Sequence, residues 1–196
     1  MVRFDDNIIL AIGAHGDDIE YGCGGFLSGF NETYGIIVAH DNDERMDECI
    51  KSANVLDYQP IFLSLSDRSI EKLELIDKLE KNIDEIKPNI ILVHSINDTH
   101  QDHKTVTEAL LSSARGYCGT ILFYKSPSTH TFNPTLHFGL LNDVFELKLE
   151  AIKKHKTQSN RIYLSEDSIK ASFGFYPTTY RQSGYAESFE LFRMVL

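Results

Sequence analysis

The chain has 196 residues, of which 42% are hydrophobic and 24% charged, and its formal net charge is −10. This composition is typical of one soluble globular domain, and it excludes a disordered chain. Because a negative surface repels phosphate backbones, we expect a small-molecule partner and no nucleic acid. Self-association into a homo-oligomer stays open.

No stretch of the chain approaches the roughly 18 to 20 apolar residues that are needed to cross a bilayer. The amino-terminal segment contains acids and only a short apolar run, which does not suit a signal peptide. The cysteines, Cys23, Cys49 and Cys118, form no Cys-x-x-Cys pair, so neither a disulfide framework nor a thiolate zinc site is indicated. We therefore expect a cytoplasmic protein without a membrane partner.

Short runs rich in β-branched residues alternate with helical patterns over the first 125 residues. The clearest helical pattern covers about 69–87, where apolar residues recur every three or four positions and Pro88 follows. Asp67 and Ser69 are the expected caps of this helix. The apolar runs predict buried strands at 8–12, 35–39, 61–65, 90–93 and 120–124.

Strands that alternate with helices predict βαβ crossovers. The expected fold class is therefore α/β: a Rossmann-like, mainly parallel sheet with helices on both faces, in a single domain over 1–196. Its core covers about 1–125. The remainder, about 126–196, is expected to cover the site, with a long loop at 126–139, a helix near 146–156 and a strand near 189–195.

Histidines and acids follow two of the predicted strands. In open parallel sheets, ligands bind at the carboxyl ends of the strands, where the connecting loops gather. Side chains that follow different strands can therefore meet in one crevice. These residues are His15, Asp17 and Asp18 after the first strand, and His100, Asp102 and His103 after the fourth.

Three of these side chains are suitable ligands for a metal. Catalytic zinc sites use three protein ligands, commonly imidazole and carboxylate, and keep one position open. His15 and Asp18 lie three residues apart on one turn, and His103 falls on the inward stripe of the following helix. We expect these three to hold one Zn²⁺ per chain. Asp17 then stands beside the metal, unligated, as a general base would.

Packing and helix capping offer another explanation for each motif. Vicinal acids such as Asp17 and Asp18 often only cap a helix, and a lone histidine is more often a core or surface residue than a ligand. For either motif alone, this explanation is favoured. Both motifs together, each at the end of a buried strand, are hard to explain by packing.

Two segments also resemble a known family. AHGDDIEYGCGG and NDTHQDH are similar to the two signature segments of the PIG-L-like (LmbE-like) zinc N-deacetylases. The segment Arg45-Met46-Asp47-Glu48 resembles the family's Arg-x-x-Glu helix start, and weaker similarities occur at 155–158 and 185–189. One departure is Gly16, where the family usually has Pro.

The resemblance implies the removal of an N-acetyl group from a small soluble substrate, such as an N-acetylglucosamine derivative. It also implies a role for each motif residue by position. These are the zinc ligands His15, Asp18 and His103, the base Asp17, and the charge-stabilising pair His100 and Asp102. Arg45 is expected to position substrate, although a surface ion pair with Glu48 or Asp41 explains it nearly as well.

The predicted loop at 126–139 is rich in hydrogen-bonding side chains and lies beside the aromatic residues Tyr124 and Phe132. We expect this loop to contact a sugar, since long loops in compact domains often carry binding function. A solvated connector explains it equally well. The other histidines have no motif partner, so a surface or loop role is expected for each of them: His94, His130, His137 and His155.

Two other functions stay open. The first is a non-catalytic carbohydrate- or metal-binding module on the same fold, which would have no use for an unligated Asp17. The second is a zinc hydrolase of another bond, such as an esterase or a phosphoesterase. A two-metal phosphoesterase needs more ligands than the two motifs supply.

Overall fold

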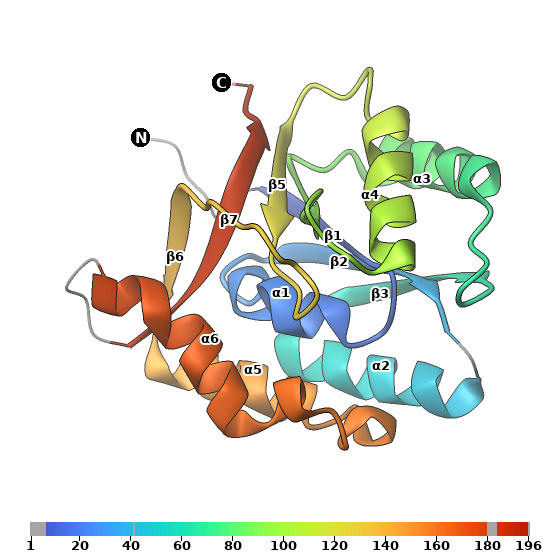
Figure 1. The fold of residues 1–196 in the computed structure, drawn as a ribbon. Coiled ribbons are helices and arrows are strands. Elements are labelled where there is room, and N and C mark those ends of the chain that lie inside the picture. Colours follow the sequence, from blue (N-terminus) through green and yellow to red (C-terminus); the bar gives the residue numbers. More distant parts are fainter. Residues whose placement is uncertain (1–6, 41, 180–183, 196) are drawn as a thin grey trace.

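The computed structural model describes residues 7–40, 42–179 and 184–195 (Figure 1). Its helices are α1 (Asp18–Leu27), α2 (Asp43–Leu56), α3 (Lys72–Ile86), α4 (Gln101–Ser113), α5 (Asn142–Ile152) and α6 (Glu166–Thr179), with short 3₁₀ turns η1 (Lys156–Gln158) and η2 (Ile162–Leu164). Its strands are β1 (Ile8–Gly13), β2 (Glu32–Ala39), β3 (Gln59–Leu65), β4 (Ile90–His94), β5 (Thr120–Tyr124), β6 (Leu136–Leu140) and β7 (Tyr185–Arg193).

The strands form one sheet in the order β3-β2-β1-β4-β5-β7-β6. Strands β1 to β5 pair in parallel, whereas β7 runs antiparallel to both β5 and β6. The strand order reverses at β1, which lies between β2 and β4. The mainly parallel α/β fold expected from the sequence is confirmed.

Helices cover both faces of the sheet (Figure 1). On one face, α3 and α4 bury side chains such as Leu75 and Val106 against the strand residue Leu10. On the other face, α1 and α2 pack with residues such as Ile9. Because consecutive strand residues point to opposite faces and both faces are covered, β1 is apolar throughout rather than alternating.

Helix α1 lies close against the sheet because it contains glycines. A Cβ atom at Gly22 would come within 2.2 Å of the Tyr124 ring on β5. Glycine at this position of the first motif therefore allows the helix to pack closely on the sheet. Cys23 is buried in the same interface, and burial raises the pKa of its thiol well above the usual value, which disfavours the thiolate form that a nucleophile needs.

Residues from the C-terminal part of the chain hold α1 in place. The helix is interrupted at Cys23, where φ is −149°. The carboxylate of Glu187 on β7 accepts hydrogen bonds from the backbone N–H groups of Gly25 and Phe26, and it therefore caps the second half of the helix. Lys148 on α5 pairs with this buried carboxylate. Through these contacts β7 and α5 position the helix that carries Asp18.

Several boundaries differ from those expected. Helix α3 begins at Lys72, with Glu71 rather than Asp67 or Ser69 at its N-cap position. Helix α5 occupies 142–152 rather than 146–156, and β7 occupies 185–193 rather than 189–195. The segment 126–139 is not wholly a loop, because β6 begins at Leu136. Strand β6 pairs with β7, about fifty residues away in the chain, and a local sequence pattern does not contain that pairing.

Among the residues that the structure describes, no helix has the length and apolar character needed to span a membrane.

Candidate active site

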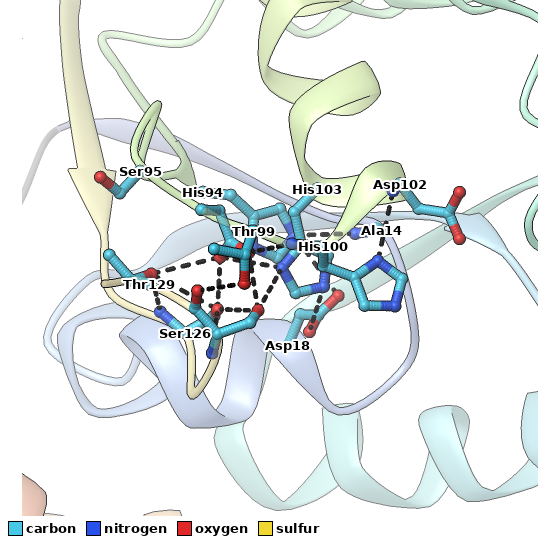
Figure 2. Close-up of polar contacts among 12 residues, drawn as sticks. Ala14, Asp18, His94, Ser95, Thr99, His100, Asp102, His103, Ser126 and Thr129 are labelled. Carbon is cyan, nitrogen blue, oxygen red and sulfur yellow. Dashed lines mark hydrogen bonds and ion pairs between the residues drawn. The ribbon is translucent and has the colours of Figure 1, made fainter. Parts of the chain in front are cut away.

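The two motifs meet at the carboxyl ends of β1 and β4, which are neighbours in the sheet. The candidate ligand atoms of His15, Asp18 and His103 lie within 4.8 Å of one another. Nε2 of His103 lies 3.4 Å from Oδ1 of Asp18, and Figure 2 shows these two side chains pointing toward each other. The structure therefore brings together the three residues expected to bind metal.

His103 is held in place by Asp98. Its Nδ1–H donates to Oδ2 of Asp98 at 3.0 Å, which leaves Nε2 facing Asp18. A carboxylate on the far nitrogen of a ligand histidine fixes both its orientation and its tautomer. Asp98 in turn accepts hydrogen bonds from three hydroxyls of the segment after β5, those of Ser126, Ser128 and Thr129.

His15 has a similar arrangement. Its Nδ1 lies 3.4 Å from Oδ2 of Asp18, and its backbone N–H donates to the same oxygen. Its Nε2 lies 3.1 Å from Asp67 and 3.2 Å from Asp102. Each of the two histidines therefore has one ring nitrogen facing Asp18, while its other ring nitrogen contacts a different carboxylate. Asp67 serves here as a partner of His15, not as a helix cap.

The acids determine the charge of these histidines. Burial opposes protonation of His15, but the hydrogen bond and the charge of Asp18 outweigh it and raise the pKa of His15 to about 9. Burial likewise opposes protonation of His103, and Asp18 and Asp98 raise its pKa to about 10. Burial alone would raise the pKa of Asp18, but the nearby His103 and His94 hold it well below the usual value.

This donor set fits a divalent metal. Two imidazoles and one carboxylate converge, and each imidazole has a carboxylate behind it, as is common for metal-binding histidines. Protons on His15 and His103 balance the charge of Asp18 in the metal-free protein, and a divalent cation that displaced them would balance the same charge.

Asp17 occupies the N-cap position of α1, but its side chain makes no capping hydrogen bond. It is only 8% exposed and lines the same pocket as the three candidate ligands. Burial and repulsion from Asp18 raise the pKa of its carboxyl group. A buried carboxylate that the helix does not use, beside a candidate metal site, has the placement of a general base.

His100 and Asp102 interact differently from the pair expected. The backbone N–H of Asp102 donates to Nδ1 of His100 at 3.2 Å (Figure 2). The carboxylate of Asp102 contacts His15 and the backbone N–H of Arg68 instead. Burial and the neighbouring His103 lower the pKa of His100. These contacts favour a neutral His100 that donates a hydrogen bond from Nε2.

His94 was expected to have a surface or loop role, and this prediction is wrong. It ends β4 and is completely buried, with Nε2 accepting a hydrogen bond from the backbone N–H of Ala14 at 3.1 Å. Its ring stacks on that of His103 at a centroid distance of 3.8 Å. Burial and His103 lower its pKa to about 4. Its position directly after three buried apolar residues is the signal that could have indicated burial.

His155 lies in the loop between α5 and η1, one of the two roles expected for it, but it is buried beside α1 rather than at the surface, and its Nε2 lies 3.6 Å from Oε1 of Glu20. Burial opposes its protonation, but Glu20 and Asp17 raise its pKa. For His130 the loop role is confirmed, because it is exposed and contacts the carbonyl of Asn97. His137 lies on β6 and contacts Ser188.

The polar segment after β5 supports the site rather than offering free hydroxyls to a sugar. Ser126 and Thr129 hydrogen-bond to Asp98, and Pro127 and Ser128 are the residues of this segment that line the pocket. Tyr124 is completely buried and donates its hydroxyl to the carbonyl of Ile12. Tyr124, beside this segment, therefore offers no exposed ring for a sugar to pack on.

The pocket above the motif residues has a volume of about 410 Å³. Arg45 lines it, as expected for a residue that positions substrate. Of the two acids that could pair with this arginine at the surface, Asp41 lies outside the described residues. Glu48 is buried and accepts hydrogen bonds from the N–H and hydroxyl of Thr157. Through this contact α2 anchors η1, the beginning of the segment 156–164 that forms one wall of the pocket.

Gly16, the departure from the usual Pro, lies against Cys49. A Cβ atom at Gly16 would come within 2.2 Å of Sγ of Cys49 on α2. The cysteine side chain therefore occupies the space that a larger residue at position 16 would need. The turn between His15 and Asp17 is held by packing rather than by a proline ring.

Comparison with known proteins decides the family. The sequence profile described as "PIG-L: GlcNAc-PI de-N-acetylase" matches residues 10–114. The chain belongs to the PIG-L family. The matched region contains both motifs and every ligand candidate described above.

Other PIG-L relatives cover most of the chain. "Uncharacterized deacetylase YaiS" of Escherichia coli (strain K12) is 34% identical over 169 residues, which is 76% of this chain and 90% of that protein. Among solved structures, the N,N'-diacetylchitobiose deacetylase of Pyrococcus horikoshii is similar, with a TM-score of 0.82, 21% identity, and coverage of 96% of this chain and 85% of that one.

The same fold also occurs in a protein described as a hydratase. The 4-carboxy-2-hydroxymuconate hydratase GalB of Pseudomonas putida KT2440 has a TM-score of 0.79 at 15% identity, covering 97% of this chain and 98% of that one. Structural similarity at this level of identity shows the fold alone. The reaction of this PIG-L protein therefore depends on the residues of its site rather than on its fold.

The contact between Asp98 and His103 leads to a first prediction. Asp98→Asn should weaken zinc binding by about 10- to 100-fold, because a neutral amide holds the ligand histidine less firmly than a carboxylate does. Competition with a chromophoric chelator measures the zinc affinity. Asp143→Asn, at an exposed position on α5, is the matched control. Equal affinities in the two variants would show that Asp98 does not support the metal site.

Proposed function

We propose that this protein is a zinc-dependent N-deacetylase that removes the acetyl group from an N-acetylated amino sugar, such as an N-acetylglucosamine derivative. The observation that carries the proposal is the convergence of His15, Asp18 and His103. Beside them lies Asp17, which is buried and whose side chain makes no capping hydrogen bond. Membership of the PIG-L family supports it, as does the deacetylase named among its relatives.

Zn²⁺ held by His15, Asp18 and His103 would polarise the acetamide carbonyl and make a nearby water more acidic. Asp17 accepts the proton of the attacking water. Its carboxyl group suits this task because burial and Asp18 raise its pKa toward the working pH. The proton that Asp17 has accepted is then available to the departing amine.

His100 lines the same pocket as the α1 acids and occupies the N-cap position of α4. Because its Nδ1 accepts a hydrogen bond from the backbone, its Nε2–H is the ring's donor. A donor at this place stabilises the negative charge that develops on the carbonyl oxygen. Asp102 contributes indirectly, by orienting His15 through its carboxylate and His100 through its N–H.

A non-catalytic binding module explains the site less well, because it requires neither a buried Asp17 nor a donor at His100. A zinc hydrolase that cleaves another bond would use the same ligands, so the two activities are distinguished by which substrates the protein hydrolyses. The decisive experiment measures acetate release from N-acetylglucosamine derivatives, N-acetyl amino acids and acetylated polyamines.

We expect zinc-loaded protein to release acetate from the sugars, chelator-treated protein to be inactive, and added zinc to restore the activity. Preference for the amino acids or the polyamines would refute the sugar assignment. Hydrolysis of an ester substrate with no acetate release from any amide would refute the deacetylase.

A further inference from the structure

The segment 156–164, between α5 and α6, forms one wall of the pocket. The residues of this segment that line the pocket are Gln158, Arg161, Tyr163 and Leu164. The family profile matches residues 10–114, so this wall lies outside the matched region, whereas the acids and histidines of the two motifs lie inside it. The family match therefore covers the reacting centre but not the substrate contacts that this wall can make.

The backbone of this segment is held at several points. The N–H of Leu164 donates to the carbonyl of Arg161 at 3.0 Å, which closes the turn that contains Tyr163. Thr157, at the start of the segment, is tied to the buried carboxylate of Glu48 on α2. At its end, Leu164 packs against the apolar cluster that residues of α5 and α6 form. A side chain on such a segment is presented to a ligand in a definite position.

Tyr163 is the tyrosine of the pocket that a ligand can reach. It is 36% exposed and lines the pocket, whereas the neighbouring Ile162 is 84% exposed and does not line it. Tyr21, the other tyrosine among the described lining residues, is only 4% exposed, and its ring packs on that of Phe173 at a centroid distance of 5.3 Å. Phe132, from the segment expected to contact a sugar, is not a lining residue.

The charge of the catalytic acids reaches the Tyr163 side chain. Burial and the negative charge of Asp17 raise the pKa of the Tyr163 hydroxyl, and Arg161 acts in the opposite direction. Tyr163 therefore lies near the acid that we propose as the base. A substrate held against its ring can present its acetamide to the motif residues that line the same pocket.

A pyranose ring has C–H groups on its faces and hydroxyl groups around its edge. An aromatic side chain can pack on such a face, while polar side chains bind the groups at the edge. We infer that Tyr163 stacks on the sugar ring of the substrate, and that this contact makes the site prefer cyclic amino sugars to acyclic N-acetyl compounds. This inference rests on the proposed function and names the residue that selects the sugar.

The first experiment compares acetate release by zinc-loaded protein from N-acetylglucosamine and from N-acetylethanolamine. Both compounds carry an acetamide and a hydroxyl group, but only the first has a ring. We expect kcat/KM of the native protein to be at least about tenfold higher for the sugar, because stacking on an aromatic ring adds to the affinity.

The second experiment uses Tyr163→Ala and Tyr163→Phe, with Tyr34→Ala as the matched control. Tyr34 lies on β2, is partly exposed, donates its hydroxyl to Glu32 and does not line the pocket. Tyr163→Ala should raise KM for N-acetylglucosamine by about fivefold or more and KM for N-acetylethanolamine by less than about twofold. Tyr163→Phe keeps the ring and should retain the native KM for the sugar.

A binding measurement gives a readout that needs no turnover. Saturation-transfer NMR of N-acetylglucosamine with chelator-treated protein reports which protons of the sugar contact the protein. The ring protons should receive saturation from the native protein and from Tyr163→Phe, and much less from Tyr163→Ala. Circular dichroism verifies the fold of each variant, and Tyr163→Leu, which keeps apolar volume without a flat ring, replaces Tyr163→Ala if that variant does not fold.

Equal kcat/KM of the native protein for the two compounds would overturn the inference while leaving the deacetylase proposal standing. An equal rise in KM for both compounds in Tyr163→Ala, or native kinetics in that variant, would do the same. A Tyr163→Phe variant as weak as Tyr163→Ala would also overturn it, since the hydroxyl rather than the ring would then be the contact. Absence of acetate release from either compound, combined with sugar binding that Tyr163→Ala loses, would refute the proposed function and support the sugar contact.

Discussion

Asp17→Asn should lower the turnover of acetyl hydrolysis by about 100-fold or more and leave the metal content unchanged. Asparagine keeps the size and polarity of the side chain but cannot accept the proton of the attacking water. Since Asp17 belongs to none of the groups of candidate metal ligands among the described residues, zinc should stay bound. Steady-state kinetics together with elemental analysis of the same preparation measure both effects.

The pH profile tests the same assignment independently. A base must be deprotonated, and burial and Asp18 raise the pKa of Asp17 above its ordinary value of 3.8. The activity of the native protein should therefore fall as the pH decreases through this raised pKa, and the residual activity of Asp17→Asn should lack that limb. Asp77→Asn, at an exposed position on α3, should behave like the native protein. Near-normal turnover of Asp17→Asn would exclude Asp17 as the base.

His103→Ala should abolish tight metal binding and, with it, acetate release. The substitution removes one of three ligands, so two donors from α1 and the preceding turn would remain for the metal. It also leaves Asp98 without the partner that holds its pKa low. Elemental analysis of protein purified without added metal should find about one zinc per native chain and far less in the variant.

A histidine outside the pocket provides the control for this experiment. His137 on β6 contacts Ser188 and does not line the pocket, so His137→Ala should retain its zinc. Circular dichroism of all three proteins verifies that the fold is intact. A fully metal-loaded His103→Ala variant would show that the ligand set is wrong, and Asp98 with His94 would then have to be tested as ligands.

The sequence by itself determined the fold class and the centre of the site. A strand that is buried on both faces of a sheet can be recognised from a short stretch of sequence, because its residues are apolar whichever face they point to. Parallel strands then require crossovers, and crossovers place the loops after β1 and β4 at the same edge. For this reason the meeting of His15, Asp18 and His103 could be predicted before any contact was known.

Only the tertiary structure decided which residues support that centre. Contacts that support the site come from distant parts of the chain: Asp67 lies 52 residues from His15, and Ser126 lies 28 residues from Asp98, the partner of His103. Such contacts depend on how loops from different strands pack, and no local periodicity encodes them. For the same reason, the burial of His155 and the placement of Arg45, Arg68 and Arg161 around one pocket could not be predicted from the sequence.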